Sequence, residues 1–210
     1  MSIASPRPAE KRVLLSDISW SAFLDLARSD RSGARFAYDH GYLEIMTLSW
    51  RHERTKKRMA RMIEAAAVRA NSSIVASGST TLKIELKKRG IEPDECYYLA
   101  HAGAVRDLEE LDLSVDPPPD LAVEIDISRS SLDQLAIYAD MGVPEVWIYD
   151  EESLQVWLLQ SDGSYRRGQQ SAAFPFLPLD EFVEFLRRQP GIEGPEGWRS
   201  YEAWLRQLDA

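Results

Sequence analysis

The stretch from Pro119 to Asp150 constrains the fold of this chain more than any other. Within it, residues 121–127 alternate apolar positions with small or acidic ones, and residues 145–149 form a second, largely apolar run. Between the two runs, apolar residues recur at helical spacing over 132–139, and Gly142 follows as a stop signal. A strand, a helix and a strand joined by short loops predict two parallel strands linked by a crossover helix.

The first of these predicted strands also carries two acids. Glu124 and Asp126 are two positions apart, so a strand projects both side chains from one face. Like charges side by side on an otherwise apolar strand are costly unless a cation neutralises them. Asp94 lies on another predicted strand, residues 92–99, and adjacent strands are only about 5 Å apart. Carboxylates so placed suit Mg²⁺, although acids in strands are more often turn or edge residues than ligands.

The remaining elements surround this unit. No repeat or domain boundary interrupts the chain, so we expect a flexible N-terminal arm over residues 1–13 and a single domain over 14–210. Beyond Asp150 the pattern is typical of antiparallel strands. The other predicted elements are a helix over 18–28, a hairpin over 35–46, a long helix from His52 to about Ala70, short strands over 74–76 and 80–85, and helices over 179–188 and 198–208.

The composition sets outer limits on function. An apolar content of 44% is ordinary for a globular protein, and no apolar run is long enough to span a bilayer, so no membrane partner is expected. Cys96 is the only cysteine, which excludes an internal disulfide and favours the reducing cytoplasm. The net charge of −9 argues against broad affinity for nucleic acid but leaves room for a local basic surface.

One segment is concentrated in positive charge. Residues 51–61 contain six lysines and arginines and a single acid, Glu53, on the predicted long helix. This segment either holds phosphates or is a solvated helix face.

Several segments of the chain resemble a known family. Pro93-Asp94 followed by Glu124-Ile125-Asp126 resembles the PD-(D/E)XK nuclease superfamily, and more narrowly the Uma-type family of restriction endonucleases. The resemblance spans roughly residues 15–185. The segments that carry it are EPDECYYLA (92–100), PDLAVEIDIS (119–128), SLDQLAIYADMGVPEVWIYD (131–150), GYLEIM (41–46) and HER (52–54).

This resemblance implies an α/β fold with a restriction-endonuclease-like core, a central mixed β-sheet flanked by helices. It also implies an endonuclease that depends on Mg²⁺ or Mn²⁺ and acts on double-stranded DNA, as a homodimer like many relatives. By position, Asp94 and Glu124 would be metal ligands, with the backbone carbonyl of Ile125 as a further one. The residues expected to contact DNA are Arg54, Lys56, Lys57 and Arg61.

The chain departs from the superfamily pattern at one catalytic position. The usual lysine, two residues after the second acid, is Asp126 here, and the lysine that close relatives place on the following helix corresponds to Gln134. An amide can hold a water molecule but adds no positive charge. Asp126 is expected to be either a metal ligand or water holder, or a structural acid. Gln134 is expected to be either a catalytic residue or an exposed helix residue. Lys56 is a speculative substitute for the lysine.

Two other functions stay open. The missing lysine and the negative charge favour a catalytically impaired relative that serves as a binding or assembly module. A two-carboxylate glycosidase is a third reading, which no neighbouring motif supports. Three further residues have a site role only as their second interpretation. His52 could start the long helix near the cleft, but a capping or surface residue is favoured, and Glu44 is a possible site acid but is favoured as a hairpin residue. Tyr138 is favoured as a core aromatic over a base-stacking platform.

Overall fold

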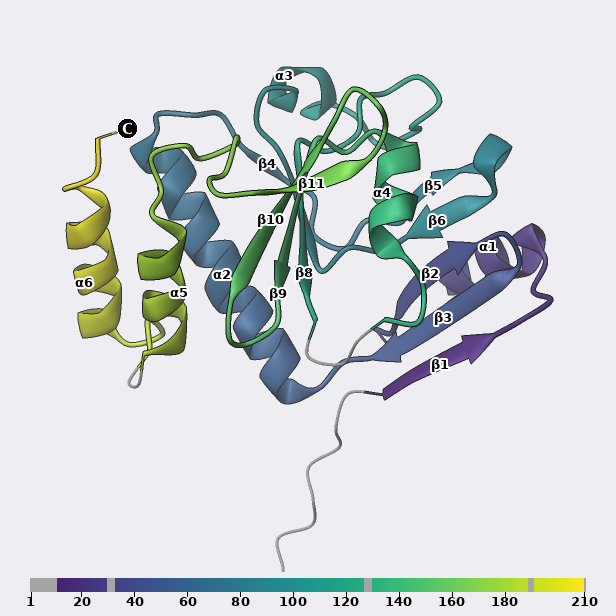
Figure 1. Cartoon of the computed structure of the whole chain (residues 1–210), viewed down its shortest axis with the longest axis horizontal. Helices are drawn as coiled ribbons and strands as arrows, with labels where there is room; N and C mark the ends of the chain where they lie inside the picture. The colour runs from purple at the N-terminus through teal and green to yellow at the C-terminus, as the bar shows by residue number, and fades with distance from the viewer. Residues whose placement is uncertain (1–10, 30–32, 127–129, 189–190, 210) are drawn as a thin grey trace, which may run out of the picture.

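The computed structural model describes residues 11–29, 33–126, 130–188 and 191–209 of the chain. Two β-sheets form its framework, and the larger one has six strands (Figure 1). These strands are β4 (Val75–Ala76), β7 (Glu95–Tyr98), β8 (Leu121–Ile125), β9 (Glu145–Tyr149), β10 (Leu154–Leu159) and β11 (Tyr165–Gly168). Their order is β11-β10-β9-β8-β7-β4; β8 and β9 are parallel, whereas the other described pairs are antiparallel.

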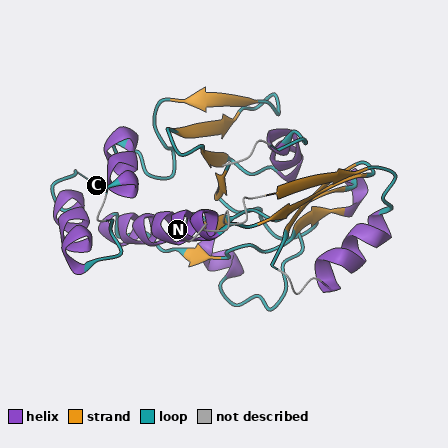
Figure 2. Cartoon of the chain, turned by 90° about the horizontal axis from the view of Figure 1, so that it is seen from below, coloured by secondary structure: helices purple, strands orange, loops and turns teal. Residues whose placement is uncertain are grey.

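The second sheet is antiparallel and has five strands in the order β1-β3-β2-β6-β5. Figure 2 shows the strands of the two sheets as separate groups. The strands are β1 (Lys11–Leu15), β2 (Arg35–Asp39), β3 (Tyr42–Thr47), β5 (Leu82–Ile84) and β6 (Arg89–Ile91). The predicted hairpin over 35–46 is therefore confirmed as β2 and β3.

The helices cover the larger sheet on both sides. In Figure 1, α2, α5 and α6 lie to its left, whereas α4 and the five-stranded sheet lie to its right. Among the described residues, no helix has both the length and the apolar character needed to cross a membrane. The helices are α1 (Trp20–Ser29), α2 (Trp50–Arg69), α3 (Ala102–Val105), α4 (Gln134–Met141), α5 (Leu179–Arg187) and α6 (Pro195–Leu205), with a 3₁₀ turn at Glu85–Lys87.

Each face of the larger sheet has its own apolar core. Val123 and Trp147 belong to the core shared with α2, α5 and α6, whereas Ala122 and Val146 belong to the core shared with α4 and the second sheet. This alternation is the period of two that the sequence shows. The predicted α/β fold, a central mixed sheet flanked by helices, is confirmed.

The predicted crossover between parallel strands is confirmed as β8, α4 and β9. Asp133 caps the start of α4 by accepting a hydrogen bond from the backbone N–H of Ala136 at 3.1 Å. Gly142 ends the helix in the left-handed conformation, with a φ of 76° that glycine adopts without strain.

The boundary of the predicted N-terminal arm was wrong for residues 11–13. They belong to β1, which pairs with β3 along its whole length, from Lys11 opposite Thr47 to Leu15 opposite Leu43. Backbone hydrogen bonding to the hairpin outweighs the polar character of this segment. Residues 1–10 lie outside the described residues, and the single domain over 14–210 stays a prediction.

Gly90 in β6 lies against a buried ring, which leads to a testable prediction. A Cβ atom at this position would meet Cζ and Cε1 of Phe23 at 2.5 and 2.6 Å, and Phe23 is itself stacked on Tyr38. We expect Gly90→Ala to lower the free energy of unfolding by about 1–3 kcal/mol, because the ring must shift within a packed core. Urea denaturation measures the loss.

Gly103 in α3 provides the matched control, because a Cβ atom there has no neighbouring atom within 4 Å. Alanine also favours helix over glycine. Gly103→Ala should therefore leave stability unchanged or slightly higher, and equal losses in the two variants would contradict the steric explanation.

Candidate active site

Asp94 and Glu124 lie next to each other on adjacent strands. In the register of β7 and β8, Glu95 is opposite Val123, so one further step places Asp94 opposite Glu124. Residues directly opposite each other in an antiparallel pair project from the same face. Both side chains are buried, with exposed fractions of 0% and 4%. The structure thus brings together the two acids that the sequence suggested as metal ligands.

Asp94 is held by a hydrogen bond at each carboxylate oxygen. The backbone N–H of Ile125 donates to Oδ2 at 2.8 Å, and Nε2 of His52 lies 2.7 Å from Oδ1. His52 comes from the first turn of α2, where Ser49 caps the helix. Strand β8 and helix α2 therefore fix the orientation of this carboxylate.

Glu124 is held in a site that disfavours its charge. Burial, followed by the negative charge of Asp94, raises the pKa of Glu124 to about 8, whereas Tyr138, Arg12 and His52 act in the opposite direction. Tyr138 of α4 donates a hydrogen bond to Oε1 of Glu124. A cation shared with Asp94 would favour the ionised form of Glu124, which is the behaviour expected of a metal ligand.

The five-stranded sheet contributes an arginine and a third acid. Arg12 of β1 lies 2.8 Å from Glu44 of β3 and 3.2 Å from Asp126, which follows β8. Glu44 is only 2% exposed, and it also accepts hydrogen bonds from Oγ of Ser130 and the backbone N–H of Ser131. Arg12 and Glu44 therefore anchor both ends of the segment that joins β8 to α4.

Gln134 is the first residue of α4, one turn before Tyr138. Residues four apart lie on the same face of a helix, so Gln134 shares the face from which Tyr138 reaches Glu124. Its side chain is half-buried rather than exposed. The structure therefore places Gln134 on the helix face directed at the carboxylates.

Three of the structural interpretations change at this site. His52 was expected to cap the helix or lie at the surface, with a place near the cleft as the alternative. It is fully buried against Asp94, so the surface interpretation was wrong. Glu44 is in the predicted hairpin and Tyr138 in the core, but both also bind site segments. Arg12 was missed. Its contact with Asp126 spans 114 positions, and no local pattern could indicate it.

The four predicted DNA contacts lie on α2 and largely have partners within the chain. Arg54 is 2.8 Å from Glu193, Lys57 is 3.5 Å from Glu95, and the guanidinium of Arg61 is 3.6 Å from the ring centre of Trp198. Lys56 is buried, with Nζ 3.3 Å from Glu53. The burial of Lys56 and its contact with Glu53 favour a structural role for this residue. They argue against Lys56 as the substitute for the missing catalytic lysine.

The donor set fits a hard divalent cation that keeps part of its water shell. Among the described residues, no group of three or more His, Cys, Asp or Glu side chains is arranged to hold a metal by itself. Mg²⁺ needs only one or two carboxylates, because waters and substrate phosphate complete its octahedron. Asp94 and Glu124 supply two carboxylates.

Comparisons with known proteins show the family and the fold of the chain. Residues 20–189 match the Uma2 family, which is described as "Putative restriction endonuclease". The chain is also similar to a solved structure from Anabaena variabilis, titled as a "putative nuclease belonging to DUF820". The two share 15% sequence identity with a TM-score of 0.53, and the alignment covers 90% of this chain and 99% of that chain. This likeness shows a shared fold. A search of curated proteins finds no match. The match over most of its length shows that the chain belongs to the Uma2 family, which supports a nuclease-like function.

Proposed function

We propose that this protein is a divalent-metal-dependent endonuclease that hydrolyses phosphodiester bonds in double-stranded DNA. The observation that carries the proposal is the pair Asp94 and Glu124, buried opposite each other on adjacent strands in a member of the Uma2 family. Two carboxyl groups buried side by side can both ionise only at a high cost, and a site for a cation accounts for their pairing.

In this proposal Asp94 and Glu124 hold Mg²⁺ or Mn²⁺, and the backbone carbonyl of Ile125 is a further ligand. The bound ion would activate a water molecule and offset charge on the phosphoryl group. His52 fixes the orientation of Asp94, and Tyr138 fixes that of Glu124. Such partners of the ligands improve metal affinity because the carboxylates need no reordering when the metal binds.

The remaining catalytic residues position water and supply positive charge. The Gln134 amide would hold the attacking water by hydrogen bonds, and the Asp126 carboxylate would accept a further hydrogen bond from that water. Arg12, held by Glu44 and Asp126, contributes the positive charge that a lysine gives elsewhere in the superfamily. Arg12 is therefore the residue that compensates for Gln134.

The proposal includes a homodimer, because two subunits can cut the two strands, and a cytoplasmic location, which a chain with a single, buried cysteine suits. Arg54, Lys57 and Arg61 remain proposed DNA contacts, whereas the burial of Lys56 disfavours that role for it. The ion pairs of Arg54 and Lys57 would exchange for phosphates as DNA binds.

Nicking of supercoiled plasmid DNA tests the proposal. With Mg²⁺ or Mn²⁺ the protein should convert supercoiled plasmid to the open circle, and EDTA should abolish the conversion. Absence of nicking with every divalent ion, together with absence of metal binding by calorimetry, would refute the assignment.

The second candidate, an impaired relative that binds without cutting, is favoured by the neutral amide of Gln134. We expect Gln134→Lys to raise the nicking rate about tenfold, or ~1.4 kcal/mol, because it adds a positive charge on the helix face directed at Glu124. Gln134→Met, which has similar length and no charge, is the control and should not raise the rate. Metal binding without wild-type nicking, but with nicking by Gln134→Lys, would establish the impaired relative.

A further inference from the structure

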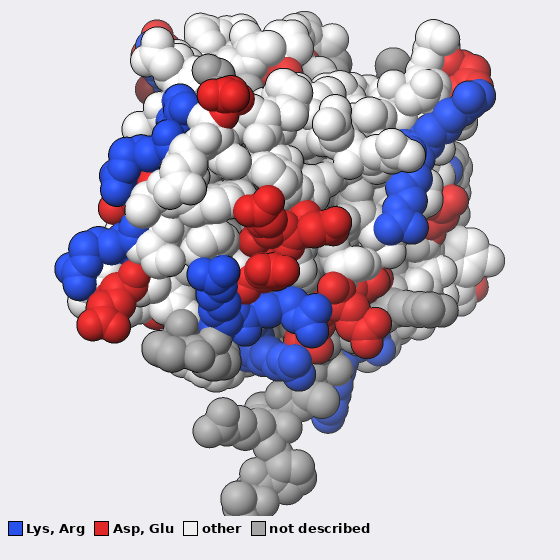
Figure 3. All heavy atoms as spheres, turned by 60° about the vertical axis from the view of Figure 1, so that its left-hand side comes forward, with Lys and Arg blue, Asp and Glu red and all other residues white. Residues whose placement is uncertain are grey.

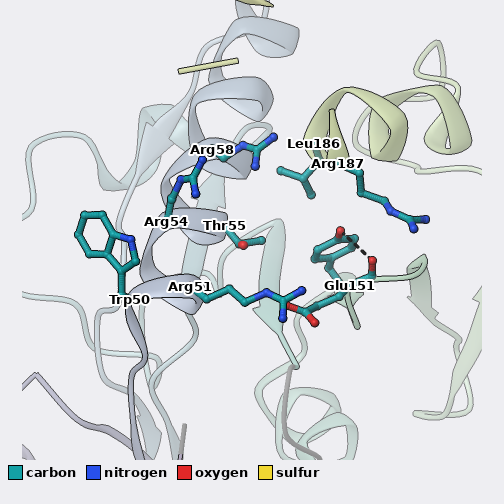
Figure 4. A pocket seen from close by; sticks show the side chains of 9 residues that line it. Trp50, Arg51, Arg54, Thr55, Arg58, Glu151, Leu186 and Arg187 are labelled. Carbon is teal, nitrogen blue, oxygen red and sulfur yellow. Dashed lines mark hydrogen bonds and ion pairs between the residues drawn. The ribbon is translucent and has the colours of Figure 1, made fainter. Parts of the chain in front are cut away.

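A pocket of about 420 Å³ lies between the start of α2, the end of β9 and the end of α5 (Figure 4). Four arginines line it: Arg51, Arg54 and Arg58 from α2, and Arg187 from α5. Figure 3 shows basic side chains gathered on the lower part of one face of the molecule, with acidic side chains beside them. In a chain with a net charge of −9, such a concentration of guanidinium groups needs an explanation.

The acids around this pocket do not balance the arginines. Glu151 lies 2.6 Å from Arg51, and Glu193 is shared between Arg54 at 2.8 Å and Arg58 at 3.6 Å. Arg187 donates instead to the backbone carbonyl of Glu152. Two carboxylates among four guanidinium groups leave a local excess of about two positive charges.

Arg58 is a largely buried cation of this pocket whose Nε lacks a hydrogen-bond acceptor among the described residues. Its side chain is only 9% exposed, and the carboxylate paired with it, Glu193, lies 3.6 Å from Nε, beyond hydrogen-bond reach. Burial lowers the pKa of Arg58, and the opposing charge of Glu193 only partly offsets this. A buried donor without an acceptor is costly, and an anion in the pocket would reduce that cost.

The shape of the donors and an aromatic neighbour indicate which anion. Guanidinium groups bind phosphate through paired, parallel hydrogen bonds. A terminal phosphate carries about −1.5 to −2 charges at neutral pH, which matches the local excess. Trp50 also lines the pocket, is 73% exposed, and offers a ring face on which a base can stack.

The pocket also lies close to the proposed catalytic carboxylates. Arg51 directly precedes His52, which binds Asp94, and Tyr149 at the pocket is paired with Ile125 of β8. The start of α2 therefore separates the two sites. We propose that the arginine pocket binds a nucleotide phosphate of the nucleic-acid substrate, with an end base or an unpaired base of that substrate stacked on Trp50. This inference rests on the proposed function for its choice of ligand.

Binding without cleavage tests the pocket. The full chain in EDTA is titrated into a fluorescein-labelled DNA duplex, and anisotropy gives the Kd. We expect Arg187→Gln and Trp50→Leu each to weaken binding about tenfold, and Arg187→Gln to reduce the log–log salt slope by about 1. Arg58→Gln should weaken it at least as much, but Arg187 is exposed and its variant keeps the test valid if Arg58→Gln fails to fold.

Arg166→Gln is the matched control, because Arg166 is 71% exposed on β11 and is absent from the pocket lining. Its Kd should stay within twofold of wild type. Unchanged binding by Arg187→Gln and Trp50→Leu would overturn the proposal, and so would equal weakening by Arg166→Gln.

Two further ligands separate the possible sources of the phosphate. A duplex with 5′-phosphate ends that binds more tightly than its 5′-hydroxyl counterpart assigns the pocket to a strand end, whereas equal binding assigns it to a backbone phosphate. Displacement of the duplex by deoxyadenosine monophosphate, but not by inorganic phosphate, assigns it to a free nucleotide. If the pocket variants weaken DNA binding but the wild-type protein does not nick plasmid DNA, the pocket is supported and the nuclease proposal is refuted. If the wild-type protein nicks plasmid DNA but the pocket variants bind DNA as tightly as wild type, the nuclease proposal is supported and the pocket is refuted.

Discussion

Asp94→Asn is expected to lower metal-dependent DNA cleavage by about 10²–10³-fold, because it removes one of the two charged ligands of the proposed ion. Asparagine has the same shape as aspartate, so its amide oxygen can still accept from the backbone N–H of Ile125 and its NH₂ group can face His52. The fold should therefore survive with a loss of about 1–3 kcal/mol in the free energy of unfolding. Plasmid nicking gives the rate, and calorimetry with Mn²⁺ should show weakened binding.

Asp120→Asn provides a matched control at the other end of the same strand pair. Asp120 accepts backbone hydrogen bonds from Leu99 at 2.7 Å and His101 at 3.0 Å, and its Oδ1 lies 2.6 Å from Nδ1 of His101. It thus repeats the backbone-and-histidine environment of Asp94 at a position remote from Glu124. A similar loss of cleavage in both variants would mean that Asp94 acts through the fold rather than through a metal ion.

The elements that the sequence predicted best are those whose signals are local. The crossover from β8 through α4 to β9 depends on alternation, helical spacing and a terminal glycine, all within some thirty residues. The opposition of Asp94 and Glu124 follows from that alternation once β7 and β8 pair. The pairing itself came only from the resemblance to a known motif, because composition and periodicity do not say which strands become neighbours.

The strands that were missed have weak local signals. β1 reads Lys-Arg-Val-Leu-Leu after a polar, proline-containing stretch, and its place at the edge of a sheet comes from pairing with β3. β6 has three residues with Gly90 in the middle, too few for a period of two to be visible. Both segments become strands because neighbouring strands offer backbone N–H and C=O groups for hydrogen bonding. This depends on the tertiary structure rather than on the local sequence.

The residues around the carboxylates illustrate the same limit. His52 binds an acid 42 positions away, and the helix signal around it favoured a cap or a surface residue over a place near the cleft. The basic segment was predicted correctly as part of a helix, but nothing local shows that Glu193 would pair with Arg54. A charge pattern indicates which helix carries positive charge, whereas only the fold shows how much of that charge is already balanced.

Arg12→Met is expected to affect both stability and activity. Methionine keeps an apolar stem of similar reach but leaves the buried Glu44 without its cation. Loss of one partner from a buried ion pair should lower the free energy of unfolding by about 3 kcal/mol, measured by urea denaturation. Adding Glu44→Gln to Arg12→Met removes the stranded charge and should recover part of this loss; no recovery would show that the ion pair is not the cause.

The effect of Arg12→Met on activity follows from Glu124. The positive charge of Arg12 lowers the pKa of Glu124, which burial and Asp94 raise to about 8. Without Arg12 that pKa rises further, so near neutral pH the carboxyl group keeps its proton more firmly against an incoming cation. Cleavage should fall about tenfold at pH 7 and recover partly as the pH rises above 8. Glu44→Gln retains Arg12, so it should keep the wild-type pH profile. An equal loss of cleavage at every pH in Arg12→Met and Glu44→Gln would assign Arg12 a purely structural role. Only removal of the Arg12 cation raises the pKa of Glu124 and so lets protons compete more strongly with the metal ion.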